Sequence, residues 1–150
     1  MKKYLIDGNN LIGKIPSLAK LQQKDKQAAR AKTAFLIDSF FSSRKADVFL
    51  HFDGFPGEKI NTAKIKVIYS ENTTADERIK KQIEKENNQR NLIIVSSDGN
   101  IKQFAKVCSC DIITCEVFGN DLFKNASVDD EESRIKDIDD ISTFKKLFNV

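Results

Sequence analysis

The chain has 150 residues, of which 40% are apolar and 31% charged, so it can bury one core and is too short to divide comfortably into two domains. No apolar run approaches the roughly 20 residues needed to cross a bilayer, and the start MKKYLIDG lacks the long apolar stretch and cleavage site of a secretory signal. These features argue against a membrane-spanning or secreted protein. We expect a cytoplasmic protein, or one in the equivalent reducing compartment of an organelle.

The formal net charge of +3 is unevenly distributed. Residues 1–66 hold 13 Lys and Arg against 6 Asp and Glu, a net of +7, whereas residues 67–150 hold 12 against 16, a net of −4. A basic half can attract a polyanion, although its lysines can equally serve only to solvate helix faces. We expect Cys108, Cys110 and Cys115 to be free thiols, because three cysteines in one segment suit neither a disulfide framework nor a four-ligand zinc site.

Apolar runs and helical periodicities alternate along the chain. Runs rich in Ile, Val, Leu and Phe predict strands at residues 3–7, 48–53, 66–69, 92–96 and 111–116. Helical spacing of apolar residues predicts helices at 26–43, 74–86 and 101–108, and a last helix bearing Ile138, Ile141, Phe144 and Phe148. This alternation predicts an α/β fold whose central, mainly parallel sheet is buried on both faces.

Three apolar runs lead into an aspartate that is followed by glycine, at Asp7, Asp53 and Asp98. The carboxyl ends of parallel strands meet at one edge of the sheet, where open α/β folds bind ligands, so these side chains should converge. Such a cluster persists only if protons or a cation neutralise its repulsion, and oxygen ligands suit Mg²⁺ or Mn²⁺. The alternative is turn and cap chemistry, in which Asp98 caps the helix that begins near Gly99.

A fourth acid lies at the start of the predicted helix 74–86. Thr74 and Glu77 have the spacing of a capping box, which places the start of this helix. At about 100° per residue, Asp76 falls on the same side as Ile83, whereas Glu77 points to water. We therefore expect Asp76 to join the other three aspartates.

The stretch GNNLIGK, residues 8–14, has the spacing of a phosphate-binding loop and follows a predicted strand. Ile15 then stands where a Ser or Thr hydroxyl should hold Mg²⁺, and a proline comes next. A nucleotide hydrolase is therefore kept only as an alternative. The preferred interpretation makes Gly8 and Gly13 loop glycines and Lys14 a phosphate contact.

Four ordered motifs, IDGNNLI, FDG, TADERI and VSSDGN, resemble the YacP-like branch of the NYN domain ribonucleases, relatives of the PIN domain nucleases. The resemblance covers residues 3–123 and implies a three-layer PIN-like fold, an acidic site with one or two divalent cations, Mg²⁺ or Mn²⁺, and endonucleolytic cleavage of RNA. We expect the nuclease domain to occupy residues 1–126. An acidic linker and a C-terminal helix packed on the same domain would follow in residues 127–150.

The resemblance also implies roles for single residues. Asp7, Asp76 and Asp98 match the catalytic, cation-binding acids, and Asp53 matches a further ligand whose reach to the metal the sequence leaves open. Two positions resemble groups that orient the carboxylates, Asn10 and Ser97. A bound cation would lower the pKa of a water, direct it at phosphorus and neutralise charge in the transition state.

Candidate RNA contacts are the basic residues in or just after the loop that follows Asp7, and one in the flexible segment 54–64. These residues are Lys14, Lys20, Lys24, Lys26, Arg30, Lys32 and Lys59. Phe55 either stacks on a base or packs on its own domain, and His51 is interpreted as a packed or surface residue, because the proposed metal chemistry does not require it. No RNA-recognition signature is present, so specificity would come from a large partner, and the resemblance makes the ribosome a candidate. A non-catalytic RNA-binding module is the alternative function.

Overall fold

The computed structural model describes the backbone of residues 1–134 and the side chains of residues 1–124. Its elements, in chain order, are β1 (Lys2–Asp7), α1 (Gly8–Lys14), α2 (Pro16–Lys24), α3 (Lys26–Phe41), β2 (Ala46–Phe52), β3 (Lys66–Tyr69), α4 (Ala75–Lys85), the 3-10 turn η1 (Gln89–Asn91), β4 (Leu92–Val95), α5 (Gly99–Val107), β5 (Asp111–Ile113) and α6 (Cys115–Arg134). Residues 127–134 continue α6 where the sequence suggested a linker. The predicted last helix, with Ile138, Ile141, Phe144 and Phe148, lies outside the described residues.

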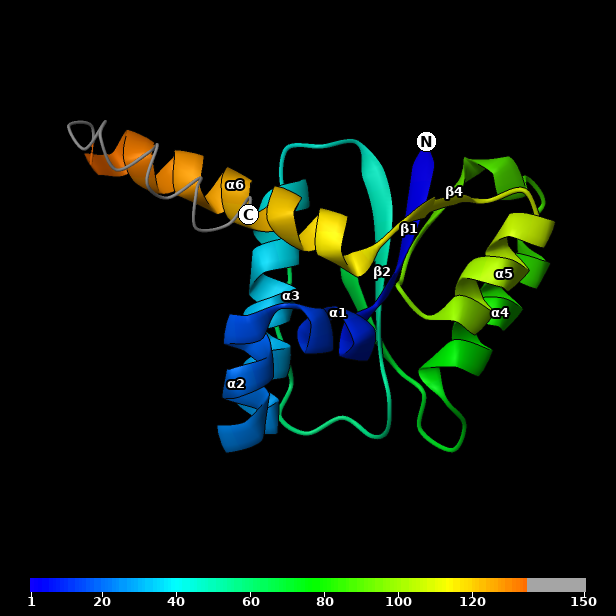
Figure 1. Cartoon of the computed structure of the whole chain (residues 1–150), viewed down its shortest axis with the longest axis horizontal. Coiled ribbons are helices and arrows are strands. Elements are labelled where there is room, and N and C mark those ends of the chain that lie inside the picture. The colour runs from blue at the N-terminus through cyan, green and yellow to red at the C-terminus, as the bar shows by residue number, and fades with distance from the viewer. Residues whose placement is uncertain (135–150) are drawn as a thin grey trace.

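The five strands form one parallel sheet in the order β3-β2-β1-β4-β5. Helices α1, α2, α3 and α6 lie on one side of this sheet, and α4 and α5 lie on the other (Figure 1). The predicted three-layer α/β fold with a central parallel sheet is therefore confirmed. The sheet places the ends of β1, β2 and β4 side by side.

The central strand β1 explains why the apolar runs are continuous. Leu5 packs with Ile83 and the rest of the α4–α5 layer, whereas Ile6 packs with Ile37 and the other layer. Both Leu5 and Ile6 have no exposed surface, and fully burying such a side chain contributes about 1.5–3 kcal/mol. A strand covered on both faces needs apolar residues at successive positions, because neighbours point to opposite sides.

The segment after β1 is helical, so its interpretation as a loop was wrong. The Asp7 carboxylate accepts a hydrogen bond from the Asn10 N–H and caps α1. Gly8 is required by packing, because a Cβ there would lie 2.6 Å from the Phe52 ring. With residues 8–14 wound into α1, this stretch forms no loop of free amides around a phosphate, which removes the basis of the nucleotide-hydrolase alternative.

The last strand is shorter than the predicted 111–116, because it ends at Ile113 and α6 begins at Cys115. The Thr114 hydroxyl accepts a hydrogen bond from the Val117 N–H and so caps the first turn of α6. Glu116, expected in a strand, is therefore carried on the first turn of a helix.

The segment between β2 and β3, predicted to be flexible, is tied to α3. Gln27 donates to the Glu58 carbonyl at 3.0 Å, and Arg30 donates to the carbonyls of Asp53 and Phe55. At the far end, the Asp38 carboxylate accepts hydrogen bonds from three successive backbone N–H groups, those of Ala63, Lys64 and Ile65. One helix therefore holds this long connection along most of its length.

Within the described residues no helix combines the length and the apolar character needed to cross a membrane. Cys108, Cys110 and Cys115 are free thiols, as the sequence predicted.

Candidate active site

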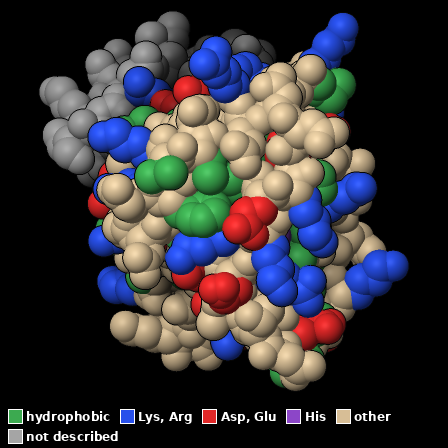
Figure 2. Space-filling view, turned by 90° about the vertical axis from the view of Figure 1, so that its right-hand side faces the viewer, with side chains coloured by type: hydrophobic (Ala, Val, Ile, Leu, Met, Phe, Trp, Pro, Cys, Tyr) green, Lys and Arg blue, Asp and Glu red, His purple; other side chains and the backbone are tan. Residues whose placement is uncertain are grey.

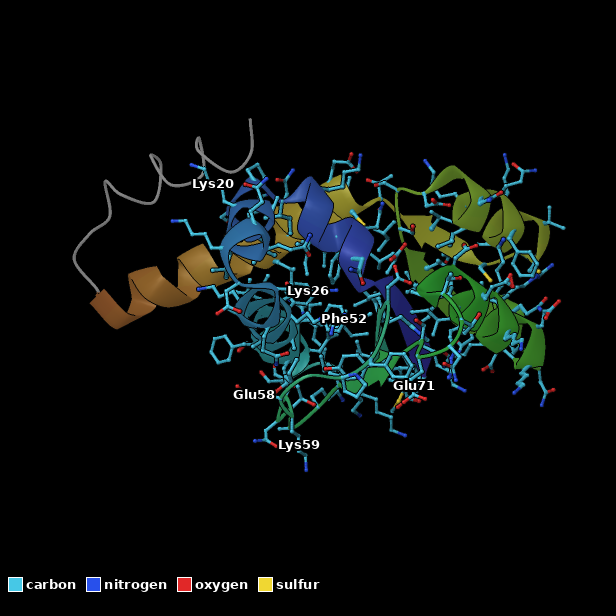
Figure 3. All side chains as sticks on the ribbon, turned by 90° about the horizontal axis from the view of Figure 1, so that it is seen from below. Lys20, Lys26, Phe52, Glu58, Lys59 and Glu71 are labelled. Carbon is cyan, nitrogen blue, oxygen red and sulfur yellow. The ribbon has the colours of Figure 1, made fainter. Side chains whose placement is uncertain are left out.

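Four aspartates from four different elements line one cleft. Asp7 ends β1, Asp53 follows β2, Asp98 lies between β4 and α5, and Asp76 lies in the first turn of α4. The cleft has a volume of about 550 Å³, and we call it the aspartate cleft; its lining residues are Asp7, Asn9, Asn10, Asp53, Thr73, Thr74, Ala75, Asp76, Asp98 and Ile101. Figure 3 views the molecule from the edge of the sheet at which these strands end. The structure thus brings together the acids that the sequence placed there.

Asp7 is the most enclosed acid of the cleft, with 7% of its surface exposed. Its two carboxylate oxygens accept hydrogen bonds from the Asn10 N–H at 3.4 Å and from the Ser96 hydroxyl at 3.2 Å. Burial, reinforced by the charges of Asp53 and Asp98, nevertheless raises the pKa of Asp7 to about 6. A cation in the cleft would lower the free-energy cost of the buried, charged Asp7 carboxylate, because it would favour the charged form.

Asp53 and Asp98 each cap a helix with one oxygen. Asp53 Oδ1 accepts from the Ala75 N–H at 2.7 Å, at the start of α4, and Asp98 Oδ1 accepts from the Ile101 N–H at 3.1 Å, at the start of α5. The second carboxylate oxygen of each residue has no hydrogen-bond partner among the described residues. Capping and cation binding are therefore compatible here, since one oxygen serves each purpose.

Asp76 faces the cleft and Glu77 is exposed, as predicted from their helical positions. Thr74 caps α4, because its hydroxyl accepts from the Glu77 N–H at 3.1 Å. Asp76 Oδ2 lies 3.2 Å from the Lys80 ammonium, and Asp76 Oδ1 is buried without a partner among the described side chains. A buried carboxylate oxygen without a donor is costly, and a cation is one way to satisfy it.

The residues fit a hard divalent cation by their chemistry, because the titratable ligands offered by the cleft are all carboxylates. As they stand in residues 1–124, no three His, Cys, Asp or Glu side chains are gathered closely enough to hold one ion. Side-chain rotation, and release of Asp76 by Lys80, would be needed for Asp7, Asp53, Asp76 and Asp98 to share a cation.

Of the two residues predicted to orient the carboxylates, Asn10 contacts one of the aspartates and the Ser97 side chain does not. Asn10 holds Asp7 through its N–H, and its side-chain oxygen accepts from the Ser97 N–H at 2.8 Å. Ser97 does not contact the predicted acids with its hydroxyl, which donates to Glu116 instead. The hydroxyl that donates to Asp7 belongs to the preceding residue, Ser96, which was not among the predicted site residues.

Glu116 is a second residue that the sequence-based prediction did not include, and it adds a carboxylate beside Ser97. The Ser97 hydroxyl, with the nearby charges of Lys14 and Lys102, holds the pKa of Glu116 below its usual value. The assignment of residues 111–116 to a strand concealed it, because only the first turn of α6 brings Glu116 to Ser97.

The predicted RNA contacts lie outside the cleft, since no lysine or arginine lines it. Six of them are exposed, namely Lys14, Lys20, Lys24, Lys26, Lys32 and Lys59. In Figure 3, Lys20 and Lys59 lie on the side of α2 and α3, away from α4. On the opposite face, formed by α4 and α5, acidic and basic side chains are interspersed around an apolar patch (Figure 2). That mixed face offers a polyanion no continuous basic surface.

Arg30 is not an RNA contact, because only 4% of it is exposed. Its guanidinium lies 5.3 Å from the ring centres of both Phe52 and Tyr69 and donates to two backbone carbonyls of the following segment. A charged side chain in this part of the sequence predicts a surface position, but Arg30 is buried between α3 and the sheet.

His51 is packed, as interpreted from the sequence. It is 2% exposed, one ring nitrogen lies 2.9 Å from Gln82 Oε1, and burial lowers its pKa to about 4. Phe55, by contrast, is 60% exposed, so its ring is available to a ligand.

Comparisons with known proteins agree with this architecture. A family model described as the YacP-like NYN domain matches residues 4–147. A crystal structure of Rae1 (YacP) from Bacillus subtilis superposes with a TM-score of 0.74 at 25% identity, covering 98% of this chain and 87% of that one. Its W164L mutant gives a TM-score of 0.71 at 23% identity, covering 91% and 82%. No curated protein sequence matches significantly.

Proposed function

Because the chain belongs to the YacP-like NYN domain family, we propose that the aspartate cleft is the active site of a divalent-metal-dependent endoribonuclease. Membership of this family supports a PIN-like, nuclease-type function directed at RNA. The observation that carries the finer proposal is the convergence of Asp7, Asp53, Asp76 and Asp98 on one cleft, where burial and like charge raise the pKa of Asp7.

Asp7, Asp76 and Asp98 would hold Mg²⁺ or Mn²⁺, with Asp53 as a fourth carboxylate. Such an ion supplies a water of lowered pKa and neutralises charge on the phosphoryl group. The protein's own part is to fix the carboxylates. Asn10 and Ser96 orient Asp7, while the N-terminal turns of α4 and α5 hold Asp53 and Asp98.

Helices α4 and α5 contribute a second effect. Both begin at the cleft, so the positive ends of their dipoles favour the charged carboxylates and an incoming phosphate. No histidine takes part, because His51 is buried against Gln82. Selection of the RNA by a large partner such as the ribosome is part of the proposal, and it rests on the family resemblance.

The test is incubation of the pure protein with end-labelled single-stranded RNA in Mn²⁺, in Mg²⁺ and in EDTA, with Asp7→Asn beside it. We expect internal cleavage that chelation and the substitution both abolish. Asp47→Asn is the matched control, because it removes the same charge as Asp7→Asn and Asp47 is exposed at the other end of β2. A DNA oligonucleotide of the same sequence shows whether the activity requires the 2′-hydroxyl.

One observation favours a second candidate, a non-catalytic RNA-binding module. The Lys80–Asp76 ion pair already neutralises one acid without a metal. RNA retention without products, unchanged by EDTA, would support that function and contradict the nuclease.

A further inference from the structure

A second hollow lies beside the aspartate cleft, between the segment after Asp53 and the edge strand β3. It has a volume of about 540 Å³ and mainly apolar walls. We call it the base groove and define it by six of its lining residues, Pro56, Lys59, Ile60, Ile65, Val67 and Tyr69. No function described above uses it.

The walls of the base groove are held in place. One wall is strand β3, where the Tyr69 ring packs against Phe52 at 6.0 Å and over the Arg30 guanidinium at 5.3 Å. The other wall is the segment that α3 fixes through Gln27 and Asp38. A groove formed before the ligand arrives costs little ordering on binding.

A ridge of backbone, formed by Gly54 with Ser70 and Glu71, lies between residues of the cleft and residues of the base groove. The Gly54 N–H donates to the Ser70 hydroxyl, and the Glu71 N–H donates to the Gly54 carbonyl, each at 2.8 Å. Gly54, at φ +87°, carries no side chain over this ridge. From Asp53 in the cleft to Pro56 in the groove is three residues, at most about 11 Å of chain, so one ligand strand can occupy both hollows.

The groove offers what an unpaired nucleotide needs. Its walls suit the apolar faces of a base, and the Tyr69 hydroxyl, which has no hydrogen-bond partner among the described residues, can reach a base edge. Lys59 is exposed at the rim and forms no ion pair within the described residues, so it is free to meet a phosphate. Phe55, 60% exposed beside the ridge, adds an aromatic surface on which a base can stack.

We propose that the base groove binds an unpaired nucleotide of single-stranded RNA, next to the phosphate held in the aspartate cleft. The inference rests on the proposed function and extends it, because it assigns one flank of the substrate to β3 and the segment 54–62. An extended peptide pairing with β3 is less well supported, since continuity with the cleft and the cation at the rim both favour a polyanion.

The experiment measures binding without cleavage. A labelled single-stranded oligoribonucleotide of about 10 nucleotides is titrated by fluorescence anisotropy onto Asp7→Asn protein in EDTA. Adding Lys59→Ala should weaken binding and lower the slope of log affinity against log salt by about one. Adding Phe55→Ala should weaken it about fivefold or more. Lys45→Ala, the matched control at the opposite end of β2, should change neither quantity, and Lys59→Arg should restore the slope.

A second readout locates the RNA directly. Oligonucleotides carrying 4-thiouridine should crosslink under ultraviolet light to peptides within residues 54–69. Three results would overturn the proposal that the base groove binds RNA. These are unchanged affinity in both Lys59→Ala and Phe55→Ala, no measurable binding, and crosslinks only to α2 and α3. If RNA crosslinks to residues 54–69 but no preparation cleaves it, the nuclease proposal fails and the groove stands.

Discussion

The ammonium of Lys80 lies 3.2 Å from Asp76, one helical turn away on α4, and gives this acid a counter-ion within the protein. The pair is partly shielded, since the Lys80 and Asp76 side chains are 23% and 34% exposed. Lys80 also lies 5.8 Å from the centre of the Phe104 ring on α5. A cation that binds Asp76 must therefore compete with Lys80.

Lys80→Met should raise the affinity for Mn²⁺, measured by isothermal titration calorimetry on metal-free protein. The substitution removes the competitor and leaves both oxygens of Asp76 available to the ion. The melting temperature should change little, because an i,i+4 ion pair contributes only about 0.3–0.5 kcal/mol. Lys81→Met, on the exposed face of the same helix, is the control and should leave Mn²⁺ affinity nearly unchanged. Equal affinities in the two variants would exclude Asp76 as a ligand that Lys80 blocks.

Asp98 has two roles that different substitutions separate. Asp98→Asn keeps a good helix cap for α5 and removes the charge, so RNA cleavage should fall by orders of magnitude while the melting temperature holds or rises. Asp98→Ala removes the cap as well and should cost about 0.5–2 kcal/mol of unfolding free energy. Cleavage assays and urea denaturation on both variants make the comparison. Full cleavage activity in Asp98→Asn would mean that Asp98 is only a cap.

The features that could be predicted from sequence follow from local rules. Continuous apolar runs indicated strands buried on both faces, and an acid just past such a run lies at the carboxyl edge of a parallel sheet. The position of Asp76 was predicted from helical spacing. The Asp76–Lys80 ion pair could have been predicted in the same way, because acids and lysines four residues apart meet on a helix.

The errors arose where tertiary packing decides. Glycines at the spacing of a phosphate-binding loop led to the interpretation of the chain after Asp7 as a loop, yet burial of Leu11 and Leu18 stabilises two short helices there. Helical spacing places Arg30 four and seven residues before the buried Ala34 and Ile37, a signal that its interpretation as an RNA contact did not use, whereas the rings that enclose its charge come from β2 and β3. Likewise Ser96, and not Ser97, reaches Asp7 because of the direction in which each side chain leaves the end of β4.

Arg30→Met should destabilise the protein and release the segment 54–65. The substitution leaves the carbonyls of Asp53 and Phe55 without their charged donor, a loss of about 2 kcal/mol or more. We expect a lower melting temperature, faster proteolysis within this segment, and an unchanged salt slope of RNA binding, because Arg30 does not reach the solvent. Lys32→Met, on the exposed face of α3, should leave stability intact. A reduced salt slope in Arg30→Met would instead restore Arg30 as a phosphate contact.

The raised pKa of Asp7 makes the stability of the metal-free protein depend on pH. The folded value is about 6, above the 3.8 of an ordinary aspartate, so the folded state holds this proton more tightly than the unfolded state. The contribution of Asp7 to the free energy of unfolding should therefore fall as pH rises from about 4 to about 6, by about 3 kcal/mol at most. Denaturation curves in EDTA, for wild type and Asp7→Asn, measure the difference.

Asp7→Asn should remove this pH dependence and be the more stable protein above pH 6, because the amide carries no charge into the buried site. Every other titratable group is common to both proteins, so the comparison isolates the effect of replacing Asp7. Adding Mn²⁺ should make the free energy of unfolding of the wild type depend less on pH. It should do so by stabilising the wild type above pH 6, since a bound cation takes the place of the proton. Parallel pH profiles in EDTA, or an equal response of both proteins to Mn²⁺, would show that Asp7 is not the group at which proton and cation compete.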